Sequence, residues 1–292
     1  MVGKLLFALL LVVCASNAEA ATCFWVGGTG NWNDATHWSN ASGGSGSTCA
    51  ATSSIPKNAG DIATLDGSSG GGTVTLDITL SIAQITMGAF TGTFNDGGNT
   101  ITLTTAFSNN GAATRTVVRS GAWTITASTG TIYNEQSGTL TLTDSGSLTF
   151  ATTMTGTNTI NMATGKTYNN VTFTPATNAG WPYNIDVTTP TFTTLTINKY
   201  AYLQILTNTT WTITNAPAWN AGSMSTPLLI KNSTNGTLTF STASGNPTCT
   251  FCILNRVTFG GGATWRAPNS SDQGGNSGIT ITPPGGSPCV GC

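Results

Sequence analysis

The feature that most constrains the fold is a recurring short run in which apolar residues alternate with Thr or Ser. The clearest run is TVTLDITLSI, which begins at Thr73 and places every second residue on one side. Successive side chains of a β-strand point to opposite faces, so a period of two predicts a strand with one buried face. The inward residues of this run are Val74, Leu76, Ile78, Leu80 and Ile82.

Comparable runs recur along the rest of the chain, separated by Gly, Asn or Asp. They are TITLTT from Thr100, WTITAS from Trp123, TLTLTD from Thr139, SLTFAT from Ser147, TINMAT from Thr159, NVTFTP from Asn170, TLTINK from Thr194, TWTITN from Thr210, TLTFST from Thr237 and RVTFGG from Arg256. No longer window shows a helical period of 3.6 residues. The sequence therefore predicts an all-β protein.

Two architectures fit short strands separated by turns: a β-sandwich and a parallel β-helix. The abundance of Thr, Ser and Asn favours the helix, because like residues on successive coils stack and bond to one another. We predict a single-stranded right-handed parallel β-helix over residues 60–282, with an aromatic N-terminal cap. Irregular spacing between runs suggests about eight coils of ~22 residues and a rod roughly 40 Å long.

The first twenty residues have the pattern of an export signal. Lys4 precedes an apolar run from Leu5 to Val13, and small residues at 18 and 20 favour cleavage after Ala20 over lipoprotein processing at Cys14. No other stretch is apolar and long enough to span a bilayer. The sequence predicts an extracellular or cell-surface protein, with a virion-associated one as a further option.

Charge argues against electrostatic partners. Only 7% of the residues are charged and the formal net charge is −1, which leaves no basic footprint for nucleic acid or anionic membrane. We therefore expect no nucleic-acid partner and no membrane span.

The stretch CFWVGGTGNWNDATHWS, at residues 23–39, contains Trp25, Trp32, Trp38 and the only histidine, His37. A solenoid leaves its apolar core open at both ends, so we expect residues 21–59 to form a Trp- and Gly-rich cap over the first coil. The alternative is a platform on which sugar rings stack. No metal role is expected for His37, because no ligand lies at suitable spacing.

The opening FWVGGTGNWNDATHWS, the following SIPKNAGDIATLDGSSGGGTVTL and the segment GGATWRAPNSSDQGGNSG at 261–278 carry a resemblance to known proteins. They resemble the two ends of exported or phage-encoded right-handed β-helix proteins, and the opening is similar to the start of autotransporter passengers. The resemblance covers about residues 23–105 and 225–281. It implies a surface or virion protein with an attachment or structural role, and it makes Trp265 a cap residue.

The chain departs from that family after the closing motif. Where the family has a Gly-Trp-aromatic strand, this chain has Gly278, Ile279, Thr280 and Ile281, and then a Pro/Gly/Cys tail at residues 283–292.

Six cysteines follow the leader: Cys23, Cys49, Cys249, Cys252, Cys289 and Cys292. An even number in an exported protein predicts disulfides. Pairing of Cys23 with Cys49 would staple the cap, and the last four would tie the tail to the final coil. In an extended strand residues 249 and 252 face opposite sides, which disfavours a bond between them. A zinc site made of the two C-x2-C motifs is the rival interpretation, and we expect no metal.

Acidic residues are scattered, which disfavours glycoside hydrolysis by a pair of facing carboxylates. The best catalytic candidates are Glu135 and Asp144 on neighbouring coils, with Arg115 and Arg119 one coil earlier. Solvated turn residues are the simpler interpretation of all four. A depolymerase would place the two acids about 5 to 10 Å apart in a cleft.

Three functions remain open from the sequence. The first, which we favour, is a non-catalytic attachment or assembly module that binds surface glycans or other structural subunits and needs no cofactor. The second is a carbohydrate-binding module, for which Trp181, Tyr183, Tyr200 and Tyr202 would form an exposed aromatic line. The third is a polysaccharide-degrading enzyme. The sequence also leaves open whether three rods associate as a trimer.

Overall fold

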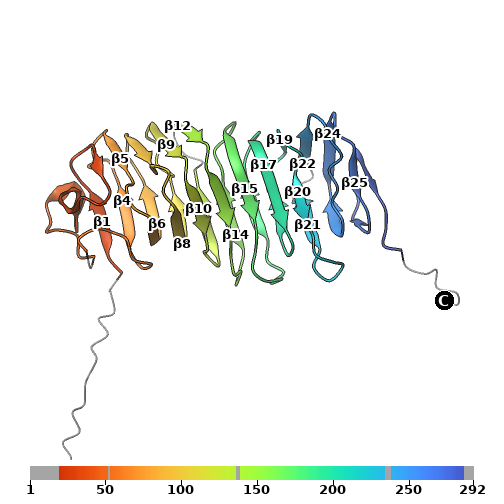
Figure 1. Cartoon of the computed structure of the whole chain (residues 1–292), viewed down its shortest axis with the longest axis horizontal. Coiled ribbons are helices and arrows are strands. Elements are labelled where there is room, and N and C mark those ends of the chain that lie inside the picture. Colours follow the sequence, from red (N-terminus) through yellow and green to blue (C-terminus); the bar gives the residue numbers. More distant parts are fainter. Residues whose placement is uncertain (1–19, 52, 136–138, 234–237, 286–292) are drawn as a thin grey trace, which may run out of the picture.

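The structure, a computed structural model, describes residues 20–51, 53–135, 139–233 and 238–285. These residues form an elongated stack of coils that runs from the N-terminal cap to the C-terminal end (Figure 1). The only helical segments among them are two 3-10 turns, Ala35–His37 and Ser42–Gly44. The predicted all-β parallel β-helix is confirmed as a β-solenoid of about eight turns. Its handedness stays a prediction.

Most strands belong to one sheet of 20 strands that winds around the rod. They are β1 (Thr22–Trp25), β3 (Trp38–Ser39), β4 (Ile62–Leu65), β6 (Leu80–Met87), β8 (Ile101–Ser108), β10 (Ala122–Ile125), β11 (Gly130–Asn134), β13 (Ser147–Phe150), β14 (Asn158–Asn161), β15 (Thr167–Phe173), β16 (Tyr183–Asp186), β17 (Thr191–Asn198), β18 (Tyr202–Ile205), β19 (Thr209–Ile213), β20 (Ala218–Asn220), β21 (Leu228–Asn232), β22 (Leu238–Thr242), β23 (Cys252–Asn255), β24 (Val257–Gly261) and β26 (Ser271–Asp272).

Two smaller sheets complete the described coils. One contains β2 (Gly30–Asn31), β5 (Thr73–Thr75), β7 (Thr93–Asn95), β9 (Arg115–Arg119) and β12 (Leu140–Asp144), and the other contains β25 (Trp265–Ala267) and β27 (Ile279–Ile281). The strands that join one coil to the next pair in parallel. The antiparallel strand pairing in the described chain is that of β1 with β3 inside the cap.

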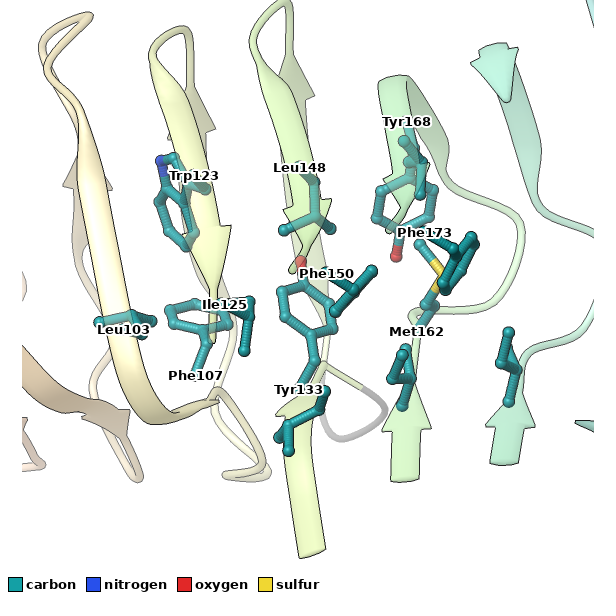
Figure 2. Packing of buried hydrophobic residues seen from close by; sticks show 14 of the residues in the cluster. Leu103, Phe107, Trp123, Ile125, Tyr133, Leu148, Phe150, Met162, Tyr168 and Phe173 are labelled. Carbon is teal, nitrogen blue, oxygen red and sulfur yellow. The ribbon is translucent and has the colours of Figure 1, made fainter. Parts of the chain in front are cut away.

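The period-two pattern decides which residues face inward. Trp123, Leu148, Val171 and Leu195 are register partners on four successive coils, and all four are buried. Inward residues therefore stack in columns along the rod, as Figure 2 shows for the central coils. Burial of apolar side chains at this density is the main favourable contribution to folding.

Outward positions of the same strands stack in register too. Thr102, Thr124, Thr149, Thr172 and Thr196 form one continuous column of threonines. β-branched residues fit a pleated surface well, and Thr combines this property with a hydroxyl that water can solvate. The alternation of Thr with apolar residues therefore corresponds to a sheet with one buried face and one solvent-exposed face.

The cap contains a cluster of buried tryptophans. The ring of Trp38 meets Trp25 edge-on at 5.1 Å and Trp32 at 4.7 Å, and Trp32 contacts Phe94 of the coils at 6.0 Å. His37 stacks on Trp25 at 4.6 Å, and its Nδ1 lies 2.7 Å from the carbonyl oxygen of Val26. Because the three indoles are buried, the side chains cannot serve as a platform for sugars.

At the other end, Trp265 is buried against a second aromatic group. Its ring lies 5.0 Å from Phe259 and 5.6 Å from Trp219, and its indole N–H donates to the carbonyl oxygen of Gly260. The end of the described coils is thus filled by aromatic side chains, although the chain continues beyond it.

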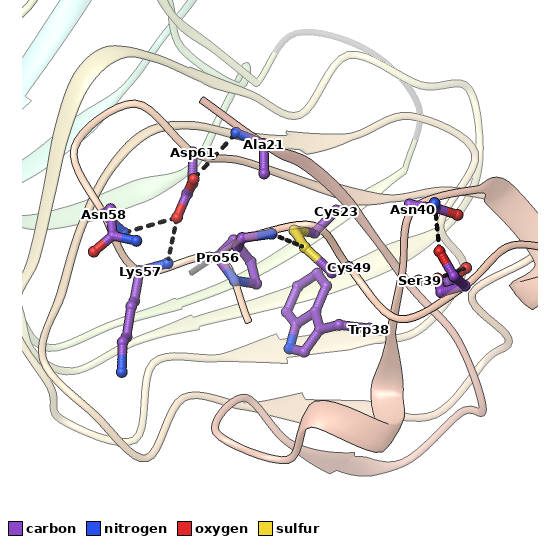
Figure 3. The surroundings of a disulfide bond; sticks show 12 residues. Ala21, Cys23, Trp38, Ser39, Asn40, Cys49, Pro56, Lys57, Asn58 and Asp61 are labelled. Atoms are coloured by element: carbon purple, nitrogen blue, oxygen red, sulfur yellow. Dashed lines mark hydrogen bonds between the residues drawn. A yellow bond between two sulfur atoms is a disulfide. The ribbon is translucent and has the colours of Figure 1, made fainter. Parts of the chain in front are cut away.

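Two disulfides are present among the described cysteines. Cys23 bonds to Cys49, with Cα atoms 5.3 Å apart, and joins β1 to the loop that closes the cap (Figure 3). Cys249 bonds to Cys252, with Cα atoms 5.8 Å apart.

The second pairing corrects our expectation that the last four cysteines tie the tail to the final coil. The chain turns at Thr250 and Phe251, and Phe251 takes a positive φ of 57°, so the segment is not the extended strand that the alternation argument assumed. Both sulfurs are buried as a result. Cys289 and Cys292 lie outside the described residues.

No helix within the described ranges is long and apolar enough to cross a membrane. The predicted leader falls almost entirely on residues 1–19, which lie outside the described chain, as do the last seven residues of the predicted tail.

We predict that the two disulfides contribute unequally to stability. Replacing Cys23 and Cys49 with Ser opens a loop with a sequence separation of 26, and we expect a loss of about 3 kcal/mol on the chain-entropy model. Replacing Cys249 and Cys252 opens a loop with a separation of only 3, and the loss on the same model is about half as large. Urea unfolding monitored by circular dichroism measures both. Equal losses would contradict the assignment of the first bond as the staple of the cap.

Candidate functional site

Arg119 and Asp144 occupy register positions on neighbouring strands, β9 and β12. Arg119 ends the run RTVVR, in which Arg115, Val117 and Arg119 share the inward phase. The guanidinium donates from Nε to one carboxylate oxygen of Asp144 at 3.1 Å and from Nη2 to the other, a bidentate ion pair. Both side chains are at most 1% exposed. The ion pair is therefore part of the interior of the rod.

Aromatic rings enclose this ion pair. The guanidinium carbon of Arg119 lies 5.5 Å from the ring of Trp123 and 5.6 Å from that of Tyr168, within the range of cation–π attraction. Its Nη1 donates to the hydroxyl oxygen of Tyr133 at 2.9 Å. The buried charge thus has a carboxylate, a hydroxyl and two ring faces as partners, which offset the cost of removing it from water.

Glu135 belongs to the same cluster. The hydroxyl of Tyr168 donates to its Oε2 at 3.0 Å, while Oε1 has no hydrogen-bond partner. Burial raises the pKa of Glu135, although Arg119 and the hydroxyls of Tyr133 and Tyr168 act in the opposite direction. Burial also raises the pKa of Tyr133 and Tyr168.

Arg115 lies inside the rod but takes no part in that ion pair. Its guanidinium donates to the carbonyl oxygens of Gly88, Asn109 and Gly111. Gly88 and Asn109 directly follow the ends of β6 and β8, so Arg115 supplies donors to backbone carbonyls where the chain leaves these strands.

The four sequence candidates for catalysis are therefore interior residues. Asp144 and Glu135 both interact with Arg119, but the cleft that a depolymerase would require does not form at these side chains, because both carboxylates are buried. The expectation that they are solvated turn residues is wrong for the same reason. A polysaccharide cannot reach either carboxylate unless the coil opens.

Asp96 has a similar structural role one coil earlier. It accepts hydrogen bonds from the backbone N–H groups of Ser120 and Gly121 and, at 2.8 Å, from the indole N–H of Trp123. Burial alone would raise the pKa of Asp96, but the hydrogen bonds from Gly121, Gly98, Ser120 and Trp123 outweigh it and lower the pKa. Carboxylates at these corners serve to satisfy backbone donors where the chain turns between strands.

The aromatic residues proposed as a binding line do not form one. Tyr183 is fully buried, and its hydroxyl lies 2.6 Å from that of Thr152. Trp181 is 46% exposed and comes just before β16. Tyr200 is half-buried in a turn with a positive φ of 70°. Only Tyr202 stands on an outward strand position, in β18.

Tyr202 begins a row of a different kind. Its register partners on the next two coils are Leu229 and Ile253, and both are partly exposed. Many other outward positions on this sheet carry polar residues, as in the threonine column from Thr102 to Thr196. The row is therefore an apolar strip on a wall that is otherwise polar, and such exposed strips are associated with binding sites.

A polar row runs beside the apolar strip. Gln204, Lys231 and Asn255 are register partners, two residues further along the same three strands. The ammonium nitrogen of Lys231 lies 5.0 Å from the centre of the Tyr202 ring, and the Tyr202 hydroxyl donates to Gln204 at 3.0 Å. No carboxylate of the described residues forms an ion pair with Lys231.

Between the two rows lies a shallow groove of ≈440 Å³, which we call the side groove. Its lining residues are Leu229, Lys231, Ile253, Asn255 and Gln273. It combines apolar contacts with an ammonium group and amide groups, the composition expected of a site for a polar organic ligand.

The sequence analysis missed all five lining residues and named only the neighbouring Tyr202. The available signal was the loss of alternation in LLIKN and CILN, where an apolar residue occupies the position that Thr holds in other runs. Only the register between neighbouring coils shows that these two apolar residues, Leu229 and Ile253, lie side by side.

Other hollows lie near the C-terminal end. One of ≈390 Å³ is lined by Ser270, Asp272, Ile281 and the prolines that begin the tail. A smaller one of ≈200 Å³ lies over Thr248 and Arg266. Neither combines an aromatic ring with an unpaired cation.

Among the described residues no group of three or more His, Cys, Asp or Glu side chains is placed to hold a metal ion. The C-x2-C motif at residues 249 and 252 forms a disulfide instead of offering two thiolates. The zinc interpretation therefore loses half of its ligands.

Comparison of the chain with protein-family models, curated proteins and solved structures finds no match. The resemblance to exported and phage-encoded β-helix proteins stays an expectation, and the chemistry of the site has to be argued from its own residues.

We predict that the two buried carboxylates respond oppositely to neutralisation at pH 7. The substitution Asp144→Asn leaves the Arg119 charge buried without its ion-pair partner, and we expect a loss of roughly 3–5 kcal/mol in the free energy of unfolding. The substitution Glu135→Gln removes a charge that burial disfavours, and we expect little loss or a gain. Urea unfolding of the two variants measures this difference.

The pH dependence of Glu135→Gln provides a check on that prediction. A carboxyl whose pKa is raised on folding binds a proton in the native state, so its contribution lowers stability as pH rises above the unfolded value of 4.5. In the Glu135→Gln variant this decrease of the free energy of unfolding with rising pH should disappear. A large destabilisation by Glu135→Gln would show that the attraction of Glu135 to Arg119 and the two tyrosine hydroxyls outweighs the cost of burying its charge.

Asp96 should behave in the opposite way. Its pKa is lowered in the folded state, so its stabilising contribution is present above the unfolded pKa of 3.8 and is lost as pH falls through the lower folded value. We expect Asp96→Asn to lower the thermal midpoint at pH 7 and to reduce the acid sensitivity of the protein below about pH 4. Calorimetry between pH 2 and 7 tests this, and an unchanged acid limb would contradict it.

Proposed function

We propose that this protein is a non-catalytic, exported attachment module that binds surface glycans through the side groove. The observation that carries the proposal is the coincidence of Tyr202, Leu229 and Ile253 on one outward row, beside the unpaired ammonium of Lys231.

Glycans fit the chemistry of this groove. One face of a pyranose ring is apolar and packs on aromatic or aliphatic side chains, while its hydroxyls need donors and acceptors. Leu229 and Ile253 supply the apolar surface, and Asn255 and Gln273 supply amides. Successive coils are about 4.8 Å apart, a spacing comparable with one residue of an extended polysaccharide.

A binding role is favoured over polysaccharide cleavage because the acids have structural partners. Asp96 and Asp144 are occupied by backbone N–H groups, Trp123 and Arg119, and the carboxylates are buried. General acid–base catalysis requires a carboxyl within hydrogen-bond reach of the substrate. A depolymerase remains the alternative that the experiment below addresses.

Placement on a cell or virion surface, and association into a trimer, belong to the proposal as expectations. They rest on the predicted leader at residues 1–20 and on the resemblance of the chain ends to surface and virion β-helix proteins. Structural subunits are the second class of partner that a flat polar rod would suit.

The test uses immobilised bacterial surface polysaccharides as probes. We expect the wild-type protein to bind at least one of them saturably, and we expect Tyr202→Ala and Lys231→Met to weaken that binding by tenfold or more, as for loss of a central contact. Reducing ends should not increase during incubation.

Lys199→Met is the matched control, because Lys199 also lies over a tyrosine, with its ammonium 5.3 Å from the ring of Tyr200, but outside the side groove. It should bind as the wild type does. Cleavage of a polysaccharide that is lost in Glu135→Gln would replace this proposal with a depolymerase. Binding unaffected by Lys231→Met in the groove lining and by Tyr202→Ala beside it would remove the side groove from the proposal.

A further inference from the structure

Asp61 is a buried carboxylate at the edge of the cap. It is 1% exposed, and it accepts hydrogen bonds from three backbone nitrogens: Ala21 at 3.2 Å, Lys57 at 3.1 Å and Asn58 at 2.9 Å (Figure 3). Lys57 and Asn58 bind Oδ2, while Ala21 binds Oδ1. No Lys, Arg or His side chain in the described ranges forms an ion pair with Asp61. A buried carboxylate without a cation is costly unless it is otherwise compensated.

Ala21 is the point at which the chain enters the folded body. Its carbonyl oxygen accepts from the N–H of Ile62 at 2.8 Å, the first bond of the β1–β4 pairing, and its side chain is buried. Ala20, one residue earlier, is exposed. The bond between Ala20 and Ala21 is the one after which the leader pattern predicts cleavage.

We propose that cleavage between Ala20 and Ala21 creates an α-ammonium group that forms a buried ion pair with Asp61 and locks the cap. A leader-cleaving peptidase is the required catalyst. Water adds across the peptide bond: its hydroxyl becomes part of the new Ala20 carboxyl group, and Ala21 leaves as an amine that takes up a proton. The inference rests on the geometry of Asp61 and does not depend on glycan binding.

Cleavage changes the donor that Ala21 presents to Asp61. Before it, Ala21 offers one neutral amide N–H; after it, the same nitrogen offers a positive charge and three N–H donors. Charge-assisted hydrogen bonds are about twice as strong as neutral ones. Ala21 lies two residues before Cys23, so the ion pair and the Cys23–Cys49 bond would hold the same strand. The cap would reach its full stability only after the leader is removed.

The first measurement is the intact mass of the exported protein, which should correspond to a chain that begins at Ala21. The second compares chains produced to begin at Ala21 or at Ala20, each with Asp61 or with Asp61→Asn. In the Asp61 background, the extra residue should raise the unfolding equilibrium constant by roughly tenfold. In the Asp61→Asn background, the difference should fall below about twofold.

The pH dependence separates the ion pair from a mere change of length. An α-amino group titrates near 8 when free, and the carboxylate raises its pKa in the folded state. The advantage of the chain that begins at Ala21 is therefore full below about pH 8 and lost as pH rises through the folded value. Lys57 is the other ionisable side chain on the loop that supplies these donors; it is exposed and common to all four chains.

Two results would overturn the inference: an exported chain that begins at another residue, or an advantage at Ala21 that is independent of pH. The pH comparison uses only the two chains that keep Asp61, so it tests for the ion pair even if the Asp61→Asn chains do not fold.

Discussion

Parallel hydrogen bonding in register between successive coils is the constraint on which the rest of the molecule depends. It places residues roughly two dozen positions apart in the sequence directly beside each other, with their side chains pointing the same way. Inward apolar residues such as Trp123 and Leu148 become a continuous core column, and outward threonines become a continuous wet wall. Each coil depends on its neighbours for the pairing of its strands, which is why both ends require closure.

The same stacking explains why charged residues are found inside this rod. Each coil has to turn, and a turn leaves backbone N–H and C=O groups that need partners away from water. Asp96 and Arg115 meet this need at successive corners, one as an acceptor and one as a donor. Arg119 and Asp144 neutralise each other between coils. Glu135 is the least well compensated member, because one of its oxygens has no hydrogen-bond partner.

On the outer surface, the row of Tyr202, Leu229 and Ile253 places apolar side chains at outward strand positions. Threonine at an outward position satisfies both the strand and the water, so Leu229 and Ile253 in that place forgo favourable hydration. Two such residues on adjacent coils, next to Tyr202 and Lys231, are difficult to explain by folding alone. The N-terminal end differs, since there the aromatic residues are buried and Asp61 with the Cys23–Cys49 bond secures the first strand.

The sequence by itself determined the class of the fold and the orientation of most side chains. The alternation in TVTLDITLSI is local, and it states for each residue whether it faces the core or the solvent. The run RTVVR follows the same alternation, which groups Arg115 and Arg119 with Val117, but our sequence analysis interpreted both arginines as solvated turn residues.

Only the tertiary structure decided which residues meet, because register between coils depends on the lengths and shapes of the turns. Those turns carry no periodic signal. The pairing of Arg119 with Asp144, the alignment of Tyr202 with Leu229 and Ile253, and the approach of Ala21 to Asp61 all follow from register. The Cys249–Cys252 bond follows from a positive φ at Phe251, which turned a segment that alternation alone would leave extended. A strand pattern encodes direction over a few residues, whereas contact between coils is set by the path of the chain between strands.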